Sequence, residues 1–242
     1  MALRYSAVPR PIIAGVQAPP SFRDLTLGDF AVRLASPDPV PGGGSASAVA
    51  AALGASLVAM VATLSQGRPK YADHAALHEA AAPAARRLAN ELLELADEDA
   101  RAYAACAIAL KLPREAFADK EFRGQQVRET ARVAAEVPLH CVERIREVLI
   151  IAETLAGRSN VNAASDLRVA ALLLQAAGHG AAENVLVNIP LIGTNDWTQA
   201  TEKHVAELLD DVVALATKVH DIVRSGERRA ALDAMAEPVA GR

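Results

Sequence analysis

The sequence is poor in aromatic residues and in cysteine. Its 242 residues include four phenylalanines, three tyrosines, one tryptophan and two cysteines. A β-sandwich fills its core with aromatic and β-branched side chains, so this composition argues against that fold. Cys106 and Cys141 lie far apart and lack the spacing of metal ligands, which excludes a disulfide scaffold. We therefore expect the protein in the reducing cytoplasm.

An excess of positive charge is also absent. The 25 basic and 29 acidic residues give a net charge of −4, so the chain has no electrostatic footprint for binding nucleic acid. Residues 1–24 contain four prolines that interrupt any apolar run. We therefore do not expect this segment to act as a signal peptide, and we expect it to form an extended, proline-rich arm.

Charge is missing altogether from residues 46–64. This stretch is long enough to suggest a membrane span, but it is rich in Ala, Ser and Gly, which contribute little to transfer into lipid. A helix that is apolar all round also occurs at the centre of a soluble bundle. We expect that second arrangement, and hence no membrane partner.

What the sequence has in abundance is alanine, with 54 residues. Because alanine is the strongest helix former, we predict an all-α fold, a single-domain bundle of long, partly kinked helices over residues 25–228. Residues 229–242 are expected to be a frayed tail. Pro83 and Pro138 predict kinks or breaks. Residues 184–189 fit either a strand or a helix. Three helices are predicted to follow caps at Thr26, Ser45 and Asp73, and they end near residues 35, 66 and 111. Further helices are predicted over 117–156 and 163–177, and a last one from a cap at 194–196 to 225. Glycines are expected to follow the ends of these last three helices, at 157, at 178–180 and at 226.

The most unusual local feature is the glycine loop Gly42, Gly43, Gly44 and Ser45, which precedes the alanine-rich helix. Glycine permits close backbone approach, and a helix N terminus offers unpaired N–H groups that suit an anionic or carbonyl ligand. The simpler alternative is a tight loop that lets the helix pack closely. A P-loop is excluded because no Lys follows Gly44. The glycine loop of small-molecule kinases is disfavoured because no strand precedes it.

Two carboxylates stand out on less polar surroundings. Asp99 has Ala96, Ala102 and Tyr103 at helical spacing, and a carboxyl in such a place can have a raised pKa and exchange protons near neutral pH. Asp166 precedes an apolar run, although it could simply complement a helix dipole. The amides Asn184 and Asn188 lie in an apolar segment. They could read the edge of a heterocycle or simply bond to nearby backbone.

His74 and His78, four residues apart, are a possible metal pair. No matching ligand cluster accompanies them in the sequence, so no metal site is predicted.

Taken in order, these residues resemble the cyclodeaminase/cyclohydrolase family of folate enzymes. The resemblance covers about residues 25–225, and its motifs are VPGGGSASA at 40–48, KY at 70–71, DARAY at 99–103, LP at 112–113, EVPL at 136–139, NVNAASD at 160–166 and GAAENVLVN at 180–188. It implies an all-helical homodimer, a helical 184–188 segment and folate bound in a cleft lined by these segments. It also implies that no metal is required, and no cofactor beyond the tetrahydrofolate substrate.

The resemblance implies one-carbon chemistry at the carbon between N5 and N10. A cyclohydrolase adds water to 5,10-methenyltetrahydrofolate and forms 10-formyltetrahydrofolate, whereas a cyclodeaminase closes a formimino group onto N10 and releases ammonia. Carboxylates suit both reactions, so Asp99 and Asp166 are expected to share proton transfer and cation stabilisation. Lys70 would orient the water or formyl oxygen, or bind the glutamate tail. Expected to bind substrate are Gly42, Gly43, Gly44, Ser45, Tyr71, Asn162, Asn184 and Asn188.

One departure from the family pattern is Arg168, where a small residue is usual. It suggests a first alternative, amidine or formimino chemistry on a non-folate substrate. A second alternative is a non-catalytic helical subunit. Because the chain carries no formiminotransferase domain, we expect a cyclohydrolase rather than a cyclodeaminase.

Overall fold

The computed structural model describes residues 21–232, and it is all-α over that range, as predicted. The described residues contain no strand. The elements in chain order are η1 (Phe22–Asp24), α1 (Leu27–Leu34), α2 (Gly43–Ser65), η2 (Pro69–His74), α3 (Ala75–Leu110), α4 (Phe117–Leu155), η3 (Val161–Ala163), α5 (Ala164–Leu186), α6 (Ile189–Ile192) and α7 (Asp196–Ser225), where η marks a 3-10 helix.

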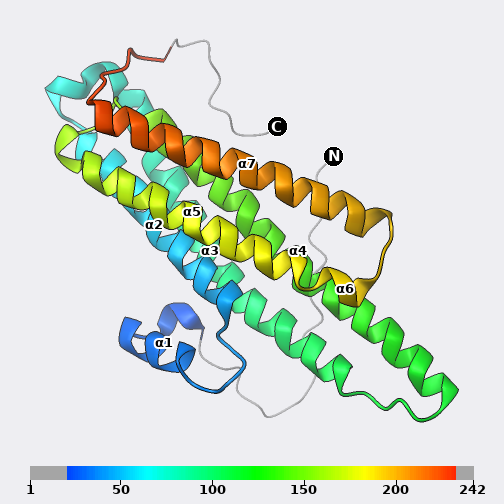
Figure 1. Cartoon of the computed structure of the whole chain (residues 1–242). Coiled ribbons are helices and arrows are strands. Elements are labelled where there is room, and N and C mark those ends of the chain that lie inside the picture. Colours follow the sequence, from blue (N-terminus) through cyan, green and yellow to red (C-terminus); the bar gives the residue numbers. More distant parts are fainter. Residues whose placement is uncertain (1–20, 233–242) are drawn as a thin grey trace.

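Five long helices, α2, α3, α4, α5 and α7, lie side by side as a bundle (Figure 1). The C-terminal end of α3 and the N-terminal end of α4 extend past the other helices, and α1 lies outside the bundle. Neither predicted proline break occurs, because α3 runs through Pro83 and α4 through Pro138 as continuous helices. Packing along both helices offsets the backbone hydrogen bond that each proline removes.

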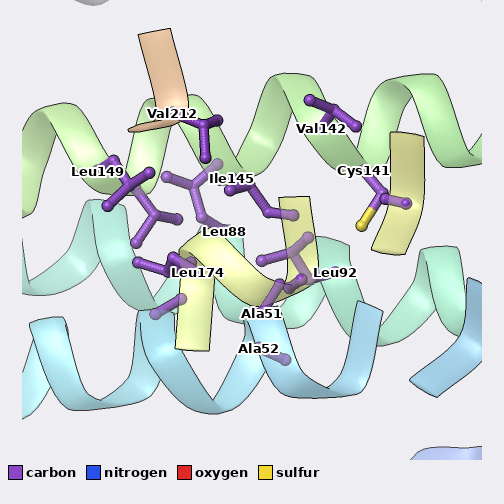
Figure 2. Close-up of a cluster of buried hydrophobic side chains, with 14 of the residues drawn as sticks. Ala51, Ala52, Leu88, Leu92, Cys141, Val142, Ile145, Leu149, Leu174 and Val212 are labelled. Atoms are coloured by element: carbon purple, nitrogen blue, oxygen red, sulfur yellow. The ribbon is translucent and has the colours of Figure 1, made fainter. Parts of the chain in front are cut away.

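The uncharged helix α2 is central to the bundle and packs against α3 and α5. The side chains that it buries are mostly alanines, including Ala51 and Ala52 in Figure 2, and these pack against larger residues of its neighbours such as Leu92 and Leu174. Gly54 permits a close approach of α5, because a Cβ there would lie 2.8 Å from Leu174 Cγ. Small side chains on α2 thus bring α3 and α5 close to its axis.

By length and composition alone, α2 could cross a membrane, and no other helix among residues 21–232 meets that test. However, 56% of its most apolar window is buried within the protein. Burial of this extent is the behaviour expected of a core helix.

Several predicted helix ends are confirmed. The Thr26 side chain caps α1 through the Asp29 N–H, and the Asn195 side chain caps α7 through the Thr198 N–H. Gly157 follows α4 and Gly226 follows α7, both with positive φ, as expected of glycines after a helix. In the 184–188 segment, which was ambiguous from its pattern, residues 184–186 are helical and end α5, and Val187 and Asn188 form a turn before α6.

Three predicted boundaries are wrong. The N-cap of α2 is Gly42 rather than Ser45, which is buried inside the first turn. Asp73 caps nothing, because it lies within η2 and α3 begins after His74. The glycines expected to end a helix near 178–180 lie inside α5. A Cβ on Gly178 would lie 3.0 Å from Val212 Cγ1 of α7, so this glycine permits close packing.

The predicted arm and tail lie mostly outside the described residues. The described end of the arm is fastened to α3, since the Phe22 N–H donates to Asp97 Oδ1 at 2.8 Å. At the other end, the Arg229 N–H donates to the Gly157 carbonyl at 3.1 Å, so the tail does not fray at residue 229 as predicted.

Candidate active site

The first turn of α2 is built so that a carboxyl group can approach its backbone. Gly42 is the N-cap, and Gly43 and Gly44 are the first two helical residues. A Cβ on Gly44 would lie 2.6 Å from Asp99 Cγ and 2.7 Å from Asp99 Oδ2. Glycine at this position therefore allows the carboxyl of Asp99, on α3, to lie against the N terminus of α2, where N–H groups lack helical partners and carry partial positive charge.

Ser45 holds Asp99 in place. Its Oγ donates to Asp99 Oδ2 at 2.8 Å. Burial raises the pKa of Asp99 above its ordinary value, and it outweighs the hydrogen bonds from the Ser45 side chain and backbone, which favour the ionised form. A carboxyl in this state can both accept and return a proton closer to neutral pH than an exposed aspartate can.

The neighbouring acids are used differently. Asp97 accepts hydrogen bonds from the Phe22 N–H and the Ser21 hydroxyl, so it anchors the N-terminal segment to α3. Burial raises the pKa of Glu98, opposed by the charges of Arg101 and His140. Glu94 is exposed. Of the four acids in this cluster, Asp99 is the one that faces the α2 N terminus.

A cavity of about 310 Å³ opens beside Asp99, within the size range of small-molecule sites. Its polar part combines Asp99, the glycine loop and two amides, and its remaining wall is mostly apolar. The lining residues are Pro39, Val40, Gly42, Gly43, Gly44, Asp99, Tyr103, Cys106, Ala107, Leu110, Ala134, Asn184, Val187, Asn188 and Leu191.

Asn184 and Asn188 are fixed by the backbone. Asn184 Nδ2 donates to the Gly180 carbonyl at 2.7 Å, and Asn188 Nδ2 donates to the carbonyls of Asn184 at 2.7 Å and Ala134 at 3.2 Å. The simpler expectation, bonding to nearby backbone, therefore holds for their donors. Because Asn188 uses both of its N–H bonds in this way, it offers a bound molecule only its amide oxygen, as an acceptor.

The apolar wall of the cavity is the part that the sequence analysis missed as a site. Tyr103, Cys106 and Leu110 follow Asp99 at helical spacing on α3, and Val187 and Leu191 follow Asn184. They could have been found from the sequence, because they lie at helical spacing from Asp99 and Asn184, which had already been selected. These side chains give the site a surface suited to an aromatic or heterocyclic ring.

The other predicted site residues gather at the opposite end of α2. Tyr71 Oη accepts the Val161 N–H at 3.0 Å, and Lys70 Nζ lies 5.7 Å from the centre of the Tyr71 ring. The adjacent Asn162 donates its N–H to Asn160 Oδ1, and Asp166 stands in the first turn of α5. We call Lys70, Tyr71, Asn162 and Asp166 the distal cluster.

Within one chain, the distal cluster does not share a cavity with Asp99. The 23 residues of α2 separate the two groups, and a helix of that length spans about 35 Å. The expectation that all of these segments line one cleft is therefore not met by a single chain. The structure brings together Gly42, Gly43, Gly44, Ser45, Asp99, Asn184 and Asn188, and it does not bring Lys70, Tyr71, Asn162 or Asp166 to them.

Neither histidine of the possible metal pair has a metal-like neighbourhood. No group of three His, Cys, Asp or Glu residues among residues 21–232 is arranged to hold a metal ion. His78 is buried with its Nε2 3.1 Å from the Arg158 carbonyl, and burial lowers its pKa. It therefore serves as a neutral hydrogen-bonding residue of the core.

Comparison with solved structures identifies the fold. The structure of a formiminotetrahydrofolate cyclodeaminase from Thermotoga maritima superposes with a TM-score of 0.77, covering 84% of this chain and 98% of that one at 24% sequence identity. The likeness establishes a shared all-helical fold.

Sequence comparison identifies the family. Residues 26–207 match the formiminotransferase-cyclodeaminase family. A methenyltetrahydrofolate cyclohydrolase of Methylorubrum extorquens is 34% identical over 200 residues, which is 83% of this chain and 96% of the relative. The formimidoyltransferase-cyclodeaminase of Mus musculus is 32% identical over 199 residues, but that is 37% of its length. The chain thus belongs to this family, and it spans about a third of the length of the mouse relative.

Proposed function

We propose that this protein is a methenyltetrahydrofolate cyclohydrolase, which converts 5,10-methenyltetrahydrofolate and water to 10-formyltetrahydrofolate. The observation that carries the proposal is the Asp99 carboxyl, partly buried over the N terminus of α2 at the edge of a cavity with an apolar wall. The M. extorquens cyclohydrolase, matched over 96% of its length, supports the hydrolytic reaction.

The proposed reaction uses Asp99 as its proton carrier. The methenyl carbon belongs to a delocalised cation, which an ionised Asp99 stabilises. Water attacks this carbon and gives one proton to Asp99. The tetrahedral carbon then loses its bond to N5, Asp99 returns the proton to N5, and the second proton of the water is released as the formyl group forms. Acid–base assistance of this kind contributes roughly 10²- to 10⁴-fold to a rate.

The remaining cavity residues position the substrate. Asn184 and Asn188 would present amide oxygens to N–H groups of the pterin ring, and N–H groups of Gly42, Gly43 and Gly44 would meet its carbonyl oxygen. Ser45 is buried and bonds to Asp99, so it would act on the substrate only through that carboxyl. The wall that includes Tyr103 and Leu110 would contact the ring system. The proposal requires no metal and no cofactor beyond the tetrahydrofolate substrate, and it is consistent with a cytoplasmic enzyme.

The proposal includes a homodimer that pairs through α2 and α5. Both helices leave apolar side chains exposed, with Leu53 at 52%, Met60 at 38%, Leu64 at 40%, Val169 at 47% and Leu172 at 57%. On α2 these lie at helical spacing and no charge interrupts them. A patch of this kind is typical of an interface, and a two-fold axis allows the same patch to cover itself.

Such a dimer would complete the site. Gly44 and Ser65 stand at equal distances from the middle of α2, near Gly54. A two-fold axis across that midpoint would carry the distal cluster of one chain to the Asp99 end of the other. Asp166 of the partner subunit would then supply a second carboxylate beside Asp99, and Lys70 of the partner subunit would supply a cation.

The test is to offer the purified protein 5,10-methenyl- and 5-formiminotetrahydrofolate separately. A cyclohydrolase removes the absorbance of the methenyl compound and releases no ammonia from either substrate. Ammonia released from the formimino compound would instead identify a cyclodeaminase, the second candidate, favoured by the names of the mammalian relatives. The absence of turnover with both compounds would contradict the assignment to folate chemistry.

A further inference from the structure

Arg168, the residue that departs from the family pattern, does not face the site around Asp166. Two residues along a helix correspond to a rotation of about 200°, so Arg168 and Asp166 project from nearly opposite sides of α5. Arg168 lines a second cavity of about 130 Å³ between α5 and α7. The other lining residues are Ala171, Leu172 and Gln175 of α5, and Ala216, Thr217 and His220 of α7.

The guanidinium of Arg168 lacks a protein partner. Its Nε is buried and makes no hydrogen bond. Arg33 Nη1 is also buried without a hydrogen bond, but its guanidinium carbon lies 6.0 Å from the centre of the Phe22 ring. Two other arginines have polar partners: Arg146 pairs with Asp211, and Arg158 donates to the carbonyls of Thr154 and Ala230. A buried charged donor without an acceptor is unfavourable, because it has given up water and gained nothing in exchange.

The lining of the cavity suits an oxyanion. No carboxylate is among its residues, and Gln175, Thr217 and His220 can each direct a hydrogen-bond donor inward from two helices. The nearby Lys218 turns away, because its Nζ pairs with Glu153 at 2.9 Å. The volume is far below that of the Asp99 cavity, so the space fits one small group rather than a whole heterocycle.

We propose that this cavity is an anion site, in which Arg168 binds a carboxylate or phosphate group with assistance from Gln175, Thr217 and His220. The two Nη groups of the planar guanidinium can donate in parallel to two oxygens of one oxyanion. Occupancy would give the Arg168 guanidinium the charged partner that it lacks within the described chain. The site lies near the N-terminal half of α5 and shares no lining residue with the Asp99 cavity.

Isothermal titration with inorganic phosphate and, separately, with glutarate tests the proposal on the full-length protein. We expect saturable binding of at least one probe with one site per chain, weakened at least tenfold in Arg168→Gln. Lys203→Gln removes one positive charge from an exposed position on α7 and should bind as the wild type does. Tighter binding of phosphate identifies a phosphate site, and tighter binding of glutarate identifies a carboxylate site.

Two outcomes would overturn the site: no saturable binding of either probe, or equal binding by the wild type and Arg168→Gln. Should Arg168→Gln fold poorly by circular dichroism, Thr217→Val removes a donor from the α7 wall without changing α5, and it must also weaken binding. Turnover of 5,10-methenyltetrahydrofolate by Arg168→Gln is measured in parallel. Retained turnover with lost anion binding separates this site from the proposed activity.

Discussion

The carboxyl of Asp99 occupies the space that a side chain on Gly44 would need. A Cβ at Gly44 would lie 2.6 Å from Asp99 Cγ, whereas a Cβ at the adjacent Gly43 would meet its nearest neighbour, Asn184 Nδ2, at 3.5 Å. The two glycines are thus unequal. Gly44 makes room for the acid, whereas a Cβ on Gly43 would lie at ordinary contact distance from Asn184.

This difference predicts unequal effects of the same substitution. Gly44→Ala should displace Asp99, reduce turnover strongly and cost about 1–3 kcal/mol of unfolding free energy, the usual range for overpacking. Gly43→Ala adds the same methyl group without a clash and should fold normally. Urea unfolding and methenyltetrahydrofolate turnover, measured on both variants, give the comparison. Equal effects of the two substitutions would contradict the role assigned to Gly44.

Asp99→Asn should lower turnover by roughly 100-fold or more, because the amide cannot carry a proton. Its stability should move in the opposite direction. Burial raises the folded-state pKa of Asp99, so the wild type loses stability as the pH rises from below the ordinary aspartate value through that raised value. The asparagine variant escapes this loss and should be at least as stable as the wild type at pH 7.

Thermal unfolding of the wild type and Asp99→Asn between pH 3 and pH 8 measures this difference in the pH dependence of stability. Glu94→Gln removes an exposed carboxylate from the same helix and should change neither turnover nor stability. A wild-type level of turnover in Asp99→Asn would exclude Asp99 as the proton carrier.

Glu153 predicts the reverse dependence on pH. Burial alone would raise the pKa of Glu153, but Lys218 and Arg229 together outweigh burial and hold the pKa below its ordinary value. Its contribution to stability is therefore present above the ordinary glutamate pKa and is lost as the pH falls through the lowered one. Glu153→Gln should destabilise the protein by about 1–3 kcal/mol at pH 7.

That destabilisation should shrink in acid, where the wild type also loses the charge. Urea midpoints at pH 7 and pH 3.5 provide the measurement. Glu207→Gln breaks an exposed pair with Lys203 and is the control, since surface pairs contribute little. A pH-independent difference between Glu153→Gln and the wild type would mean that packing, rather than charge, is responsible.

Disruption of the exposed apolar face of α2 and α5 should separate the proposed dimer. Leu53→Glu introduces a charge near its centre and is expected to give a monomer in sedimentation experiments, with turnover lost. Phe117→Glu is the matched control, because Phe117 is 82% exposed at the start of α4, away from that face. A Leu53→Glu protein that remained dimeric and active would locate the interface elsewhere.

A site shared between two chains also predicts complementation. Asp99→Asn and Asp166→Asn should each be inactive alone, but mixing and reassembling them gives dimers in which one of the two sites has both acids intact. Random pairing makes half of the dimers mixed, so about one quarter of wild-type turnover should return. Failure to recover any turnover, with subunit exchange verified by mass, would show that the acids do not meet across an interface.

The sequence predicted what local chemistry determines. Side-chain caps at Thr26 and Asn195, and the positive-φ glycines 157 and 226, are readable because each depends on a few neighbouring residues. Gly178 was misjudged because its function is tertiary. It makes room for Val212 of α7, and the residues around Gly178 in the sequence do not indicate that contact.

The candidate site shows the same division. Asp99 could be selected from its apolar helical surroundings, and the structure adds the reason for its raised pKa. That the distal cluster lies about 35 Å along α2 could not be predicted, because helical spacing gives no information on which end of a bundle a segment occupies. The cavity that Arg168 lines likewise could not be predicted, because its other wall comes from α7, which is distant in sequence.

The alanine-lined core of α2 has a consequence for how this protein can change. Fully buried positions such as Ala51, Ala55 and Ala62 already carry nearly the smallest side chains available. Enlargement would push α3 and α5 apart, and reduction to glycine would loosen the helix itself. Variation in the core should therefore fall on the larger residues of α3, α4 and α5, while the buried positions of this central helix keep to small amino acids.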